Sequence, residues 1–270
     1  MRSGETDLAV EWAAREGWNP GLHDADAFAR IDPDGWFVAD LDGAIVGCVS
    51  ALRYDDRYAF VGFYIVAPEH RGKGYGIALW RAAMAHVAGC AVGLDGVLAQ
   101  IDNYARSGFA LDTRNARYRG TGGGSPGSAT RIVEEGDVAD VVAYDSTCFP
   151  AEREAFVRAW LGLPDATSRV LRRDGTIAGY GTVRRCREGW KIGPLFADDR
   201  AAAETLFADL RADAGDDGIY LDVPVAHDEA VALAERAGME VVFETARMYA
   251  GRPPVRRTER VFGVTTFELG

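Results

Sequence analysis

The sequence predicts an α/β (α+β) protein whose mixed, mostly antiparallel central sheet is flanked by helices and is built twice along the chain. Over the first 120 residues, the segments follow the order helices, three strands, helix, strand, helix, strand. A similar order returns after residue 129, which indicates a diverged internal duplication. Between the two parts lies RGTGGGSPGS, whose small and turn-forming residues are typical of a linker. We therefore expect a first domain at 1–120, a linker at 121–128 and a degenerate second copy at 129–270.

The first part is expected to begin with two helices and a hairpin. One helix covers residues 6–17, between a threonine cap and a glycine stop, and a shorter helix covers 24–30. The pair Asp42-Gly43 is a turn signal between two strand-like runs. Residues 35–54 therefore read as a β-hairpin.

A buried strand, a glycine-rich turn and an amphipathic helix follow. The strand is YAFVGFYIV at 58–66, and Pro68 ends it because proline has no amide proton to donate to the sheet. Apolar residues recur at helical spacing within 74–88, which predicts a helix. The first part then ends with a strand, a short helix closed by a glycine, and another strand, at 95–100, 102–108 and 109–119.

The second part repeats these pieces. Residues 169–186 contain a second Asp-Gly hairpin, 190–210 a strand, loop and helix, and 218–242 a strand, helix and strand. The last ten residues, VFGVTTFELG, are strand-like. We expect them to cross back and complete a sheet.

Composition and charge exclude several classes of partner. The formal net charge of −11 opposes binding to nucleic acid or to an anionic membrane surface. No apolar run has membrane-spanning length, and the N-terminus lacks the basic and apolar regions of a secretion signal. The four cysteines are scattered, without the paired spacing of a zinc site or a disulfide framework. We expect a cytoplasmic protein with no metal, no nucleic acid partner and no membrane partner.

The stretch IVAPEHRGKGYGIALW, residues 65–80, has the composition of a phosphate-binding turn. Glycines let backbone amides approach a ligand, and the N-terminus of the following helix adds partial positive charge. Arg71 and Lys73 add full charges that favour a phosphate or pyrophosphate group. A nucleoside triphosphatase loop needs Ser or Thr after its Gly-Lys pair, where this chain has glycine. A dinucleotide fingerprint needs a third glycine where this chain has Ile77, so both of these readings are weak.

Two short motifs resemble the GNAT acetyltransferase superfamily. VAPEHRGKGYG is similar to its acyl-coenzyme A loop, with Arg71, Gly74 and Gly76 at the motif positions. YARSGF places Tyr104 four residues before a Gly-Phe pair, as members of the superfamily often do. The segments EWAAREGWNPG, NYARSGF and RVFGVTTFELG extend the resemblance to the two-domain YitH-type acetyltransferases. In that group a catalytic GNAT unit is followed by a second, related domain.

The resemblance implies the GNAT fold and transfer of an acetyl group from acetyl-coenzyme A to a primary amine, by direct attack in a ternary complex. Tyr104 would be the catalytic residue, protonating the departing thiolate. Backbone amides of the loop would hold the pyrophosphate, and the preceding strand would pair with the pantetheine arm. The implied coenzyme-binding residues are Tyr64, Ile65, Val66, Arg71, Gly72, Lys73, Gly74, Tyr75, Gly76, Asn103 and Arg106. A non-catalytic acyl-coenzyme A sensor and a nucleotide-binding protein stay open as alternatives.

The general base and the acceptor site are less defined. Many members carry a glutamate on the strand before the loop, but AFVGFYIV has no carboxylate there. Glu16 and Asp102 are the candidate substitutes, and Trp18, Asn19 and His23 are candidate substrate contacts. We expect a small-molecule amine or amino-acid-like acceptor, and a monomer or homodimer.

The second copy lacks both motifs. DDRAAAET stands where the first copy has its glycine loop, and it places two carboxylates where a pyrophosphate would bind. Ala234 stands in the position of the tyrosine. We therefore expect that the fold is repeated while the coenzyme site of the second copy is lost.

Overall fold

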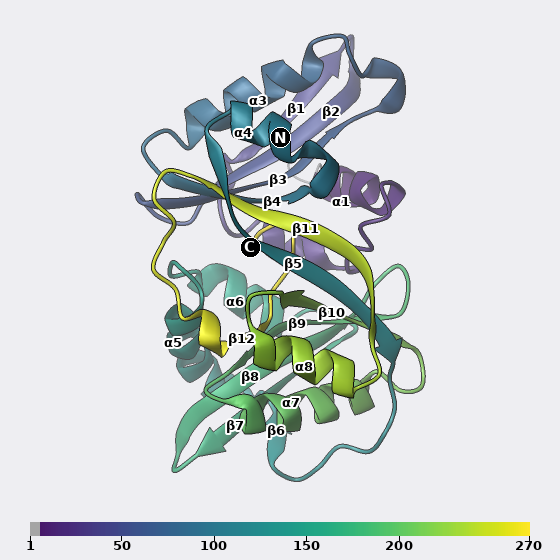
Figure 1. The fold of residues 1–270 in the computed structure, drawn as a ribbon, viewed down its shortest axis with the longest axis vertical. Coiled ribbons are helices and arrows are strands. Elements are labelled where there is room, and N and C mark those ends of the chain that lie inside the picture. The colour runs from purple at the N-terminus through teal and green to yellow at the C-terminus, as the bar shows by residue number, and fades with distance from the viewer. Residues whose placement is uncertain (1–5) are drawn as a thin grey trace.

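The computed structural model describes residues 6–270, whose strands form one twelve-stranded sheet (Figure 1). No helix within these residues is long and apolar enough to cross a membrane. The strands are β1 (Trp36–Leu41), β2 (Ala44–Arg53), β3 (Tyr58–Val66), β4 (Ala91–Val97), β5 (Phe109–Thr121), β6 (Thr130–Ile132), β7 (Ala166–Arg173), β8 (Thr176–Arg185), β9 (Trp190–Ala197), β10 (Gly218–Pro224), β11 (Glu240–Ala250) and β12 (Val261–Gly263). The α-helices are α1 (Thr6–Arg15), α2 (Asp24–Phe28), α3 (Tyr75–His86), α4 (Ile101–Arg106), α5 (Val138–Cys148), α6 (Glu154–Leu161), α7 (Arg200–Asp213) and α8 (Asp228–Arg236).

The sheet is mixed and mostly antiparallel, as predicted. Its strand order is β1-β2-β3-β4-β11-β5-β10-β9-β8-β7-β6, and β12 pairs with β9. Among the described strands, the parallel neighbours are β3 with β4 and β9 with β10, and all other pairs are antiparallel. Parallel neighbours need a crossover connection, which α3 supplies in the first part and α7 in the second. The predicted fold class is confirmed.

The two hairpins form at the Asp-Gly pairs that predicted them. Asp42 and Gly43 have φ angles of 52° and 88°, and Asp174 and Gly175 have 49° and 80°. A two-residue hairpin turn of this kind needs positive φ at both positions, which aspartate and glycine tolerate better than other residues. The turns join β1 to β2 and β7 to β8.

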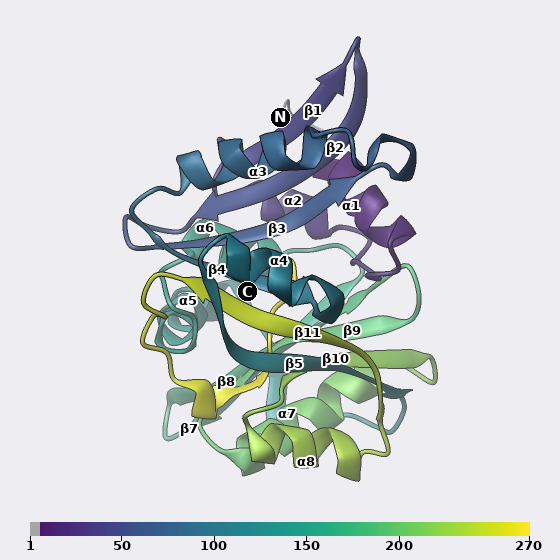
Figure 2. The ribbon, with the colours of Figure 1, turned by 45° about the horizontal axis from the view of Figure 1, so that its top comes forward.

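The two parts of the chain exchange their last strands. β11, from the second part, lies between β4 and β5 of the first, and β5 pairs on its other side with β10. Figures 1 and 2 show β5 and β11 side by side through the middle of the molecule. Because β5 extends to Thr121, strand pairing reaches the expected linker at 121–128. The division into 1–120 and 129–270 stays a prediction about two copies that share one sheet.

Three buried arginine–aspartate pairs also join the two parts. Each pair has two hydrogen bonds and contains one residue from either part. Removing one member of a buried pair leaves an uncompensated charge, so these contacts couple the two parts strongly. They are Arg117 with Asp222 (2.7 and 2.7 Å), Arg184 with Asp24 (2.7 and 3.1 Å) and Arg247 with Asp95 (2.8 and 2.6 Å).

The C-terminal segment crosses from the second part to the first, as expected. After β12 the chain runs to β3, where the Leu269 carbonyl accepts a hydrogen bond of 2.7 Å from the Tyr54 hydroxyl. A Cβ atom at Gly62 of β3 would lie 2.0 Å from the Glu268 carbonyl oxygen. Only glycine therefore lets the segment pass this close to β3.

The largest difference from the expected elements is at β4. The sequence predicted a strand at 95–100, whereas β4 covers Ala91–Val97 and Leu98–Gln100 form a 3-10 turn. This strand is rich in small residues, so its local pattern is weak, and its pairing with β3 and β11 determines its position. The helices expected at 6–17, 24–30 and 74–88 are shorter by up to three residues, at Thr6–Arg15, Asp24–Phe28 and Tyr75–His86.

Candidate active site

A gap opens in the sheet where β3 and β4 separate. They pair in parallel from Tyr58 with Ala91 to Val61 with Leu94, and both strands continue without pairing to each other. Beyond Val61, β3 also bulges against β2, and Phe63 has a φ of 49° there. Positive φ is unusual for a bulky residue, and bulges redirect side chains next to functional sites. The gap leaves one edge of β3 open to a ligand.

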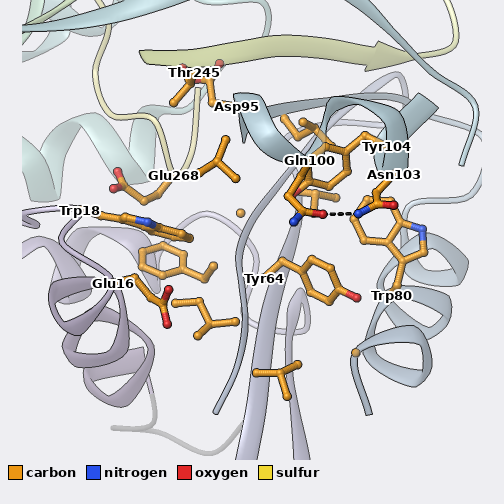
Figure 3. A pocket seen from close by; sticks show the side chains of 18 of the residues that line it. Glu16, Trp18, Tyr64, Trp80, Asp95, Gln100, Asn103, Tyr104, Thr245 and Glu268 are labelled. Atoms are coloured by element: carbon orange, nitrogen blue, oxygen red, sulfur yellow. Dashed lines mark hydrogen bonds between the residues drawn. The ribbon is translucent and has the colours of Figure 1, made fainter. Parts of the chain in front are cut away.

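A cavity of about 820 Å³ occupies this gap, a volume typical of small-molecule and cofactor sites. In Figure 3, Glu16, Trp18 and Glu268 lie on one side of it, and Tyr64, Trp80, Asn103 and Tyr104 lie on the other. Among the lining residues are twelve that the sequence analysis named. They are Glu16, Trp18, Tyr64, Ile65, Val66, Arg71, Gly72, Gly74, Gly76, Asn103, Tyr104 and Arg106.

The glycine loop has the geometry of an anion site. Gly72 and Gly74 have φ angles of 74° and 90°, which favour glycine. Gly74 is the N-cap of α3 and no side chain caps that end, so the first amides of the helix are free to bind an anion. A Cβ atom at Gly76 would lie 2.8 Å from the Tyr64 hydroxyl, so a side chain there would clash. The loop therefore fits a pyrophosphate group.

Arg71 is held in place at the mouth of the cavity. Its Nε donates to the Val66 carbonyl at 2.8 Å, and its Nη2 donates to Glu16 Oε1 at 2.6 Å. About half of the Arg71 side chain and a third of the Glu16 side chain are exposed. An exposed pair of this kind contributes little to stability, so a phosphate could replace Glu16 at the guanidinium.

Tyr104 lies on α4 with its ring against β4. A Cβ atom at Gly96 would lie 2.5 Å from the tyrosine ring, and the ring also contacts Trp80 and Phe109 with centroids 5.8 and 6.4 Å away. Burial, with a smaller contribution from Tyr64, raises the pKa of Tyr104 to about 12. The hydroxyl therefore keeps its proton throughout the neutral range and is available there as a proton donor.

Two further residues of α4 form a hydrogen-bonded row beside Tyr104. Asn103 donates to the Gln100 side chain (Figure 3). It also accepts a hydrogen bond from Arg106. Gln100 was not named from the sequence, although it lines the cavity with the other two. Arg106 adds a positive charge to this side of the cavity.

Five predicted site residues do not line the cavity. Lys73 and Asp102 are exposed, and Tyr75 contacts His70. Asn19 forms two hydrogen bonds of 2.9 Å with the backbone of Glu188, and His23 approaches Asp165 at 3.2 Å. Asn19 and His23 thus contact the second part of the chain rather than the cavity.

Several lining residues were missed because they belong to other parts of the sequence. Asp95 lies on β4 and binds Arg247, and Arg117 lies on β5 and binds Asp222. No local motif marks these two residues, and their arginine and aspartate partners come from the second part of the chain. Four more come from the second part of the chain: Phe243 and Thr245 from β11, and Phe267 and Glu268 from the C-terminal segment.

The matching gap in the second part is filled by the chain itself. β9 and β10 also separate after a short parallel stretch, and β12 pairs with β9 there. The Val264 amide then donates to the Asp222 carbonyl of β10 at 2.8 Å. The side chain of Asp199 caps α7 by accepting from the Ala202 amide at 2.9 Å. The second gap therefore has neither an open strand edge nor an uncapped helix N-terminus, which supports the expected loss of its coenzyme site.

An open strand edge can form hydrogen bonds with an extended ligand that carries amide groups. An uncapped helix N-terminus can bind a pyrophosphate group of the same ligand. Coenzyme A carries both the amides and the pyrophosphate. The fold and the cavity therefore define the class of acyltransferases that use acyl-coenzyme A.

Comparison with known proteins identifies the family. Residues 6–109 match the Acetyltransferase (GNAT) family, and residues 141–263 match an Acetyltransferase (GNAT) domain. The chain is 30% identical over 270 residues to holothin acyltransferase from a Pseudoalteromonas species, which covers 98% of this chain and 92% of that protein. The chain belongs to the GNAT acetyltransferase family and is an acyltransferase with two GNAT domains, as the resemblance predicted.

Solved structures show the same fold. A proposed acetyltransferase from Pyrococcus horikoshii has a TM-score of 0.81 at 19% identity, over 100% of this chain and 95% of that one. A tandem GNAT protein from the clavulanic acid biosynthesis pathway has a TM-score of 0.62 at 15% identity, over 94% of this chain and 98% of that one. At these identities the likeness concerns the fold alone.

Proposed function

We propose that the protein is an acetyl-coenzyme A-dependent N-acyltransferase that transfers the acetyl group to a primary amine by direct attack while both substrates are bound. One observation carries the proposal: the glycine loop, the open edge of β3 and Tyr104 all line the same cavity. One side of that cavity suits coenzyme A, and the other side is aromatic and acidic.

The residues present fit acetyl-coenzyme A, which supplies an activated thioester carbonyl when bound. Amides from Gly72 to Gly76 and the N-terminus of α3 would hold the pyrophosphate, with Arg71 adding charge. The edge of β3 at Tyr64–Val66 is unpaired with β4, although its Val66 carbonyl accepts a hydrogen bond from Arg71. Its other backbone groups would hydrogen-bond the amides of the pantetheine arm and align it toward Tyr104. Within residues 6–270, no cluster of three or more side chains that could hold a metal ion is found.

Tyr104 would donate its hydroxyl proton to the departing sulfur. Its pKa of about 12 keeps the phenol protonated, while an ordinary thiol has a pKa of about 8.5. Transfer from phenol to thiolate is therefore uphill by about 3 to 4 pKa units on these values. The proton is expected to move late, as the carbon–sulfur bond breaks, with the phenolate recovering a proton from the attacking nitrogen.

The acceptor side of the cavity suits a small amine. Trp18 and Phe243 offer aromatic surface, and Glu268 offers a negative charge. The Phe267 ring also lines the cavity, but Arg117 already lies over it, 4.9 Å from the ring centroid. Aromatic faces and a carboxylate together attract a cationic group such as an ammonium. Because a relative is named for holothin, that compound belongs in the first set of acceptors tested, together with simple primary amines and amino acids.

We also propose a reducing, cytoplasmic setting for the reaction. The four cysteines are free thiols, and Cys48, Cys148 and Cys186 are buried. Burial raises the pKa of the Cys48 and Cys148 thiols to about 12, so they stay protonated and unreactive. We therefore assign these buried cysteines a role in packing and no role in the transfer reaction.

The test measures thiol release and acetylated product with acetyl-coenzyme A and the acceptor set. Gly74→Glu is expected to abolish coenzyme A binding in calorimetry, because φ is 90° there and a carboxylate would repel the pyrophosphate. Tyr104→Phe is expected to lower turnover by about 100-fold or more with coenzyme affinity unchanged. Unchanged coenzyme A affinity in Gly74→Glu would refute the assignment of the loop as the pyrophosphate site. Wild-type turnover in Tyr104→Phe would refute the role of Tyr104 as general acid.

A further inference from the structure

The C-terminal segment brings a buried carboxylate to the cavity. Glu268 lines the cavity and is only 5% exposed. Figure 3 shows it on the side of Trp18, away from Tyr104 and Trp80. Within the described residues its carboxylate accepts no hydrogen bond and forms no ion pair, so its oxygens are free to accept a proton.

Glu268 supplies the carboxylate that β3 itself lacks. No residue of β3 carries a carboxylate, from Tyr58 to Val66. The Glu268 carbonyl oxygen lies where a Cβ atom of Gly62 would clash with it at 2.0 Å. Glycine in the middle of β3 thus makes room for a segment that supplies a carboxylate next to the strand.

The other two carboxylates of the cavity already have arginine partners. Glu16 accepts a hydrogen bond of 2.6 Å from Arg71. Asp95 accepts bonds of 2.8 and 2.6 Å from Arg247, and its side chain is fully buried. Of the cavity carboxylates in the described residues, Glu268 is the one with no arginine bound to it.

Charged groups from three strands act on Glu268. Arg117 on β5, Arg184 on β8 and Lys191 on β9 are buried cations that interact with it electrostatically. The two arginines have aspartate partners of their own, and the Lys191 Nζ donates to the Asn19 carbonyl at 2.8 Å. Glu268 therefore adds the negative charge that balances this buried cluster without being tied to any one cation.

We propose that Glu268 is the general base of the transfer reaction, an inference that rests on the proposed function. Its carboxylate takes a proton from the acceptor ammonium, and the freed lone pair forms the carbon–nitrogen bond at the thioester carbonyl. The carbon–sulfur bond breaks, and the sulfur takes the hydroxyl proton of Tyr104. The tyrosine oxygen recovers the second proton from the nitrogen, and the proton on Glu268 passes to solvent. One amide, one thiol and one released proton result.

The experiment compares Glu268→Gln with the wild type, using an acceptor identified in the panel above. The variant is expected to lose at least 100-fold in kcat, while coenzyme A affinity by calorimetry stays within twofold. Its log kcat is expected to rise with unit slope as pH increases, because the amine must then lose its proton unaided. A role in packing alone would lower kcat equally at every pH.

Two further variants complete the test. Glu259→Gln, at an exposed glutamate just before β12, is expected to retain wild-type activity. Glu268→Ala is expected to regain activity when formate is added, because a small carboxylate can enter the space left by the side chain. Near wild-type kcat in Glu268→Gln would overturn the role of Glu268 as general base. A flat pH profile of Glu268→Gln, together with no formate rescue of Glu268→Ala, would do the same. Either result would leave the proposed function intact. Failure of the wild type to acetylate any amine would overturn both.

Discussion

Gly96→Ala is expected to disable catalysis without touching a reacting group. The added Cβ atom would lie 2.5 Å from Cε2 and 2.8 Å from Cδ2 of the Tyr104 ring. An ordinary carbon–carbon separation is about 3.5 Å, so the ring must move by about 1 Å. A 1 Å misplacement of a catalytic group costs on the order of 100-fold in rate. We therefore expect kcat to fall about 100-fold.

The assay is steady-state thiol release, with coenzyme A affinity measured separately by calorimetry. Affinity is expected to change by less than threefold, because Gly96 lies on β4 and away from the glycine loop. Gly136→Ala is the matched control. It has no heavy atom within 4 Å of the added methyl group and no positive φ, so its activity is expected to equal that of the wild type.

A double variant isolates the mechanism. If the alanine acts by displacing the tyrosine hydroxyl, then adding Gly96→Ala to Tyr104→Phe should lower kcat by less than threefold further. Full additivity of the two losses would show that the alanine acts through another route, such as a shift of β4 itself. A Gly96→Ala variant with wild-type kcat would refute the idea that Tyr104 needs its observed place on the strand.

Three further predictions concern a buried ion pair between the two parts, the pH dependence of kcat, and the Glu16–Arg71 pair. Asp24→Asn should destabilise the protein by about 3–5 kcal/mol, because it leaves buried Arg184 unpaired, and thermal unfolding should show a Tm lower by roughly 10 °C. The pH profile of kcat should show no fall due to Tyr104 below about pH 10, because its raised pKa keeps the donor form; a falling limb near pH 9 that Tyr104→Phe removes would contradict this. Glu16→Gln should retain wild-type kcat and bind coenzyme A up to about fivefold more tightly, since Arg71 no longer has a competing partner; a large loss of kcat would instead make Glu16 the base.

The coenzyme side of the cavity was predictable because its chemistry lies in short, continuous stretches. The loop needs glycines and a helix start in sequence, and residues 71–76 provide both. Tyr104 lies on a short helix that begins directly after the turn following β4, so only α3, β4 and that turn separate it from the loop along the chain. Short motifs therefore predicted residues of the loop and Tyr104, which line one cavity.

The acceptor side was not predictable by the same reasoning. Alternation of apolar and polar residues indicates that a strand exists, but it does not identify the neighbours of that strand. The insertion of β11 between β4 and β5 brings Phe243 and Thr245 to the cavity. Asn19 and His23 lie in the expected turn, yet they contact the second part because that part packs directly against it.

The C-terminal segment contacts both gaps in the sheet, the one between β3 and β4 and the one between β9 and β10. Glu268 reaches Gly62 of β3 only because β12, a few residues earlier, runs along β9 within the second gap. A Cβ atom at Gly193 of β9 would lie 2.5 Å from the Thr265 carbonyl oxygen, so glycine makes room for the segment at both crossings. A coenzyme arm in the second gap would displace β12 and withdraw Glu268 from the first site. We therefore expect that coenzyme binding by the second copy would exclude a carboxylate beside β3, and β12 occupies the second gap in this chain.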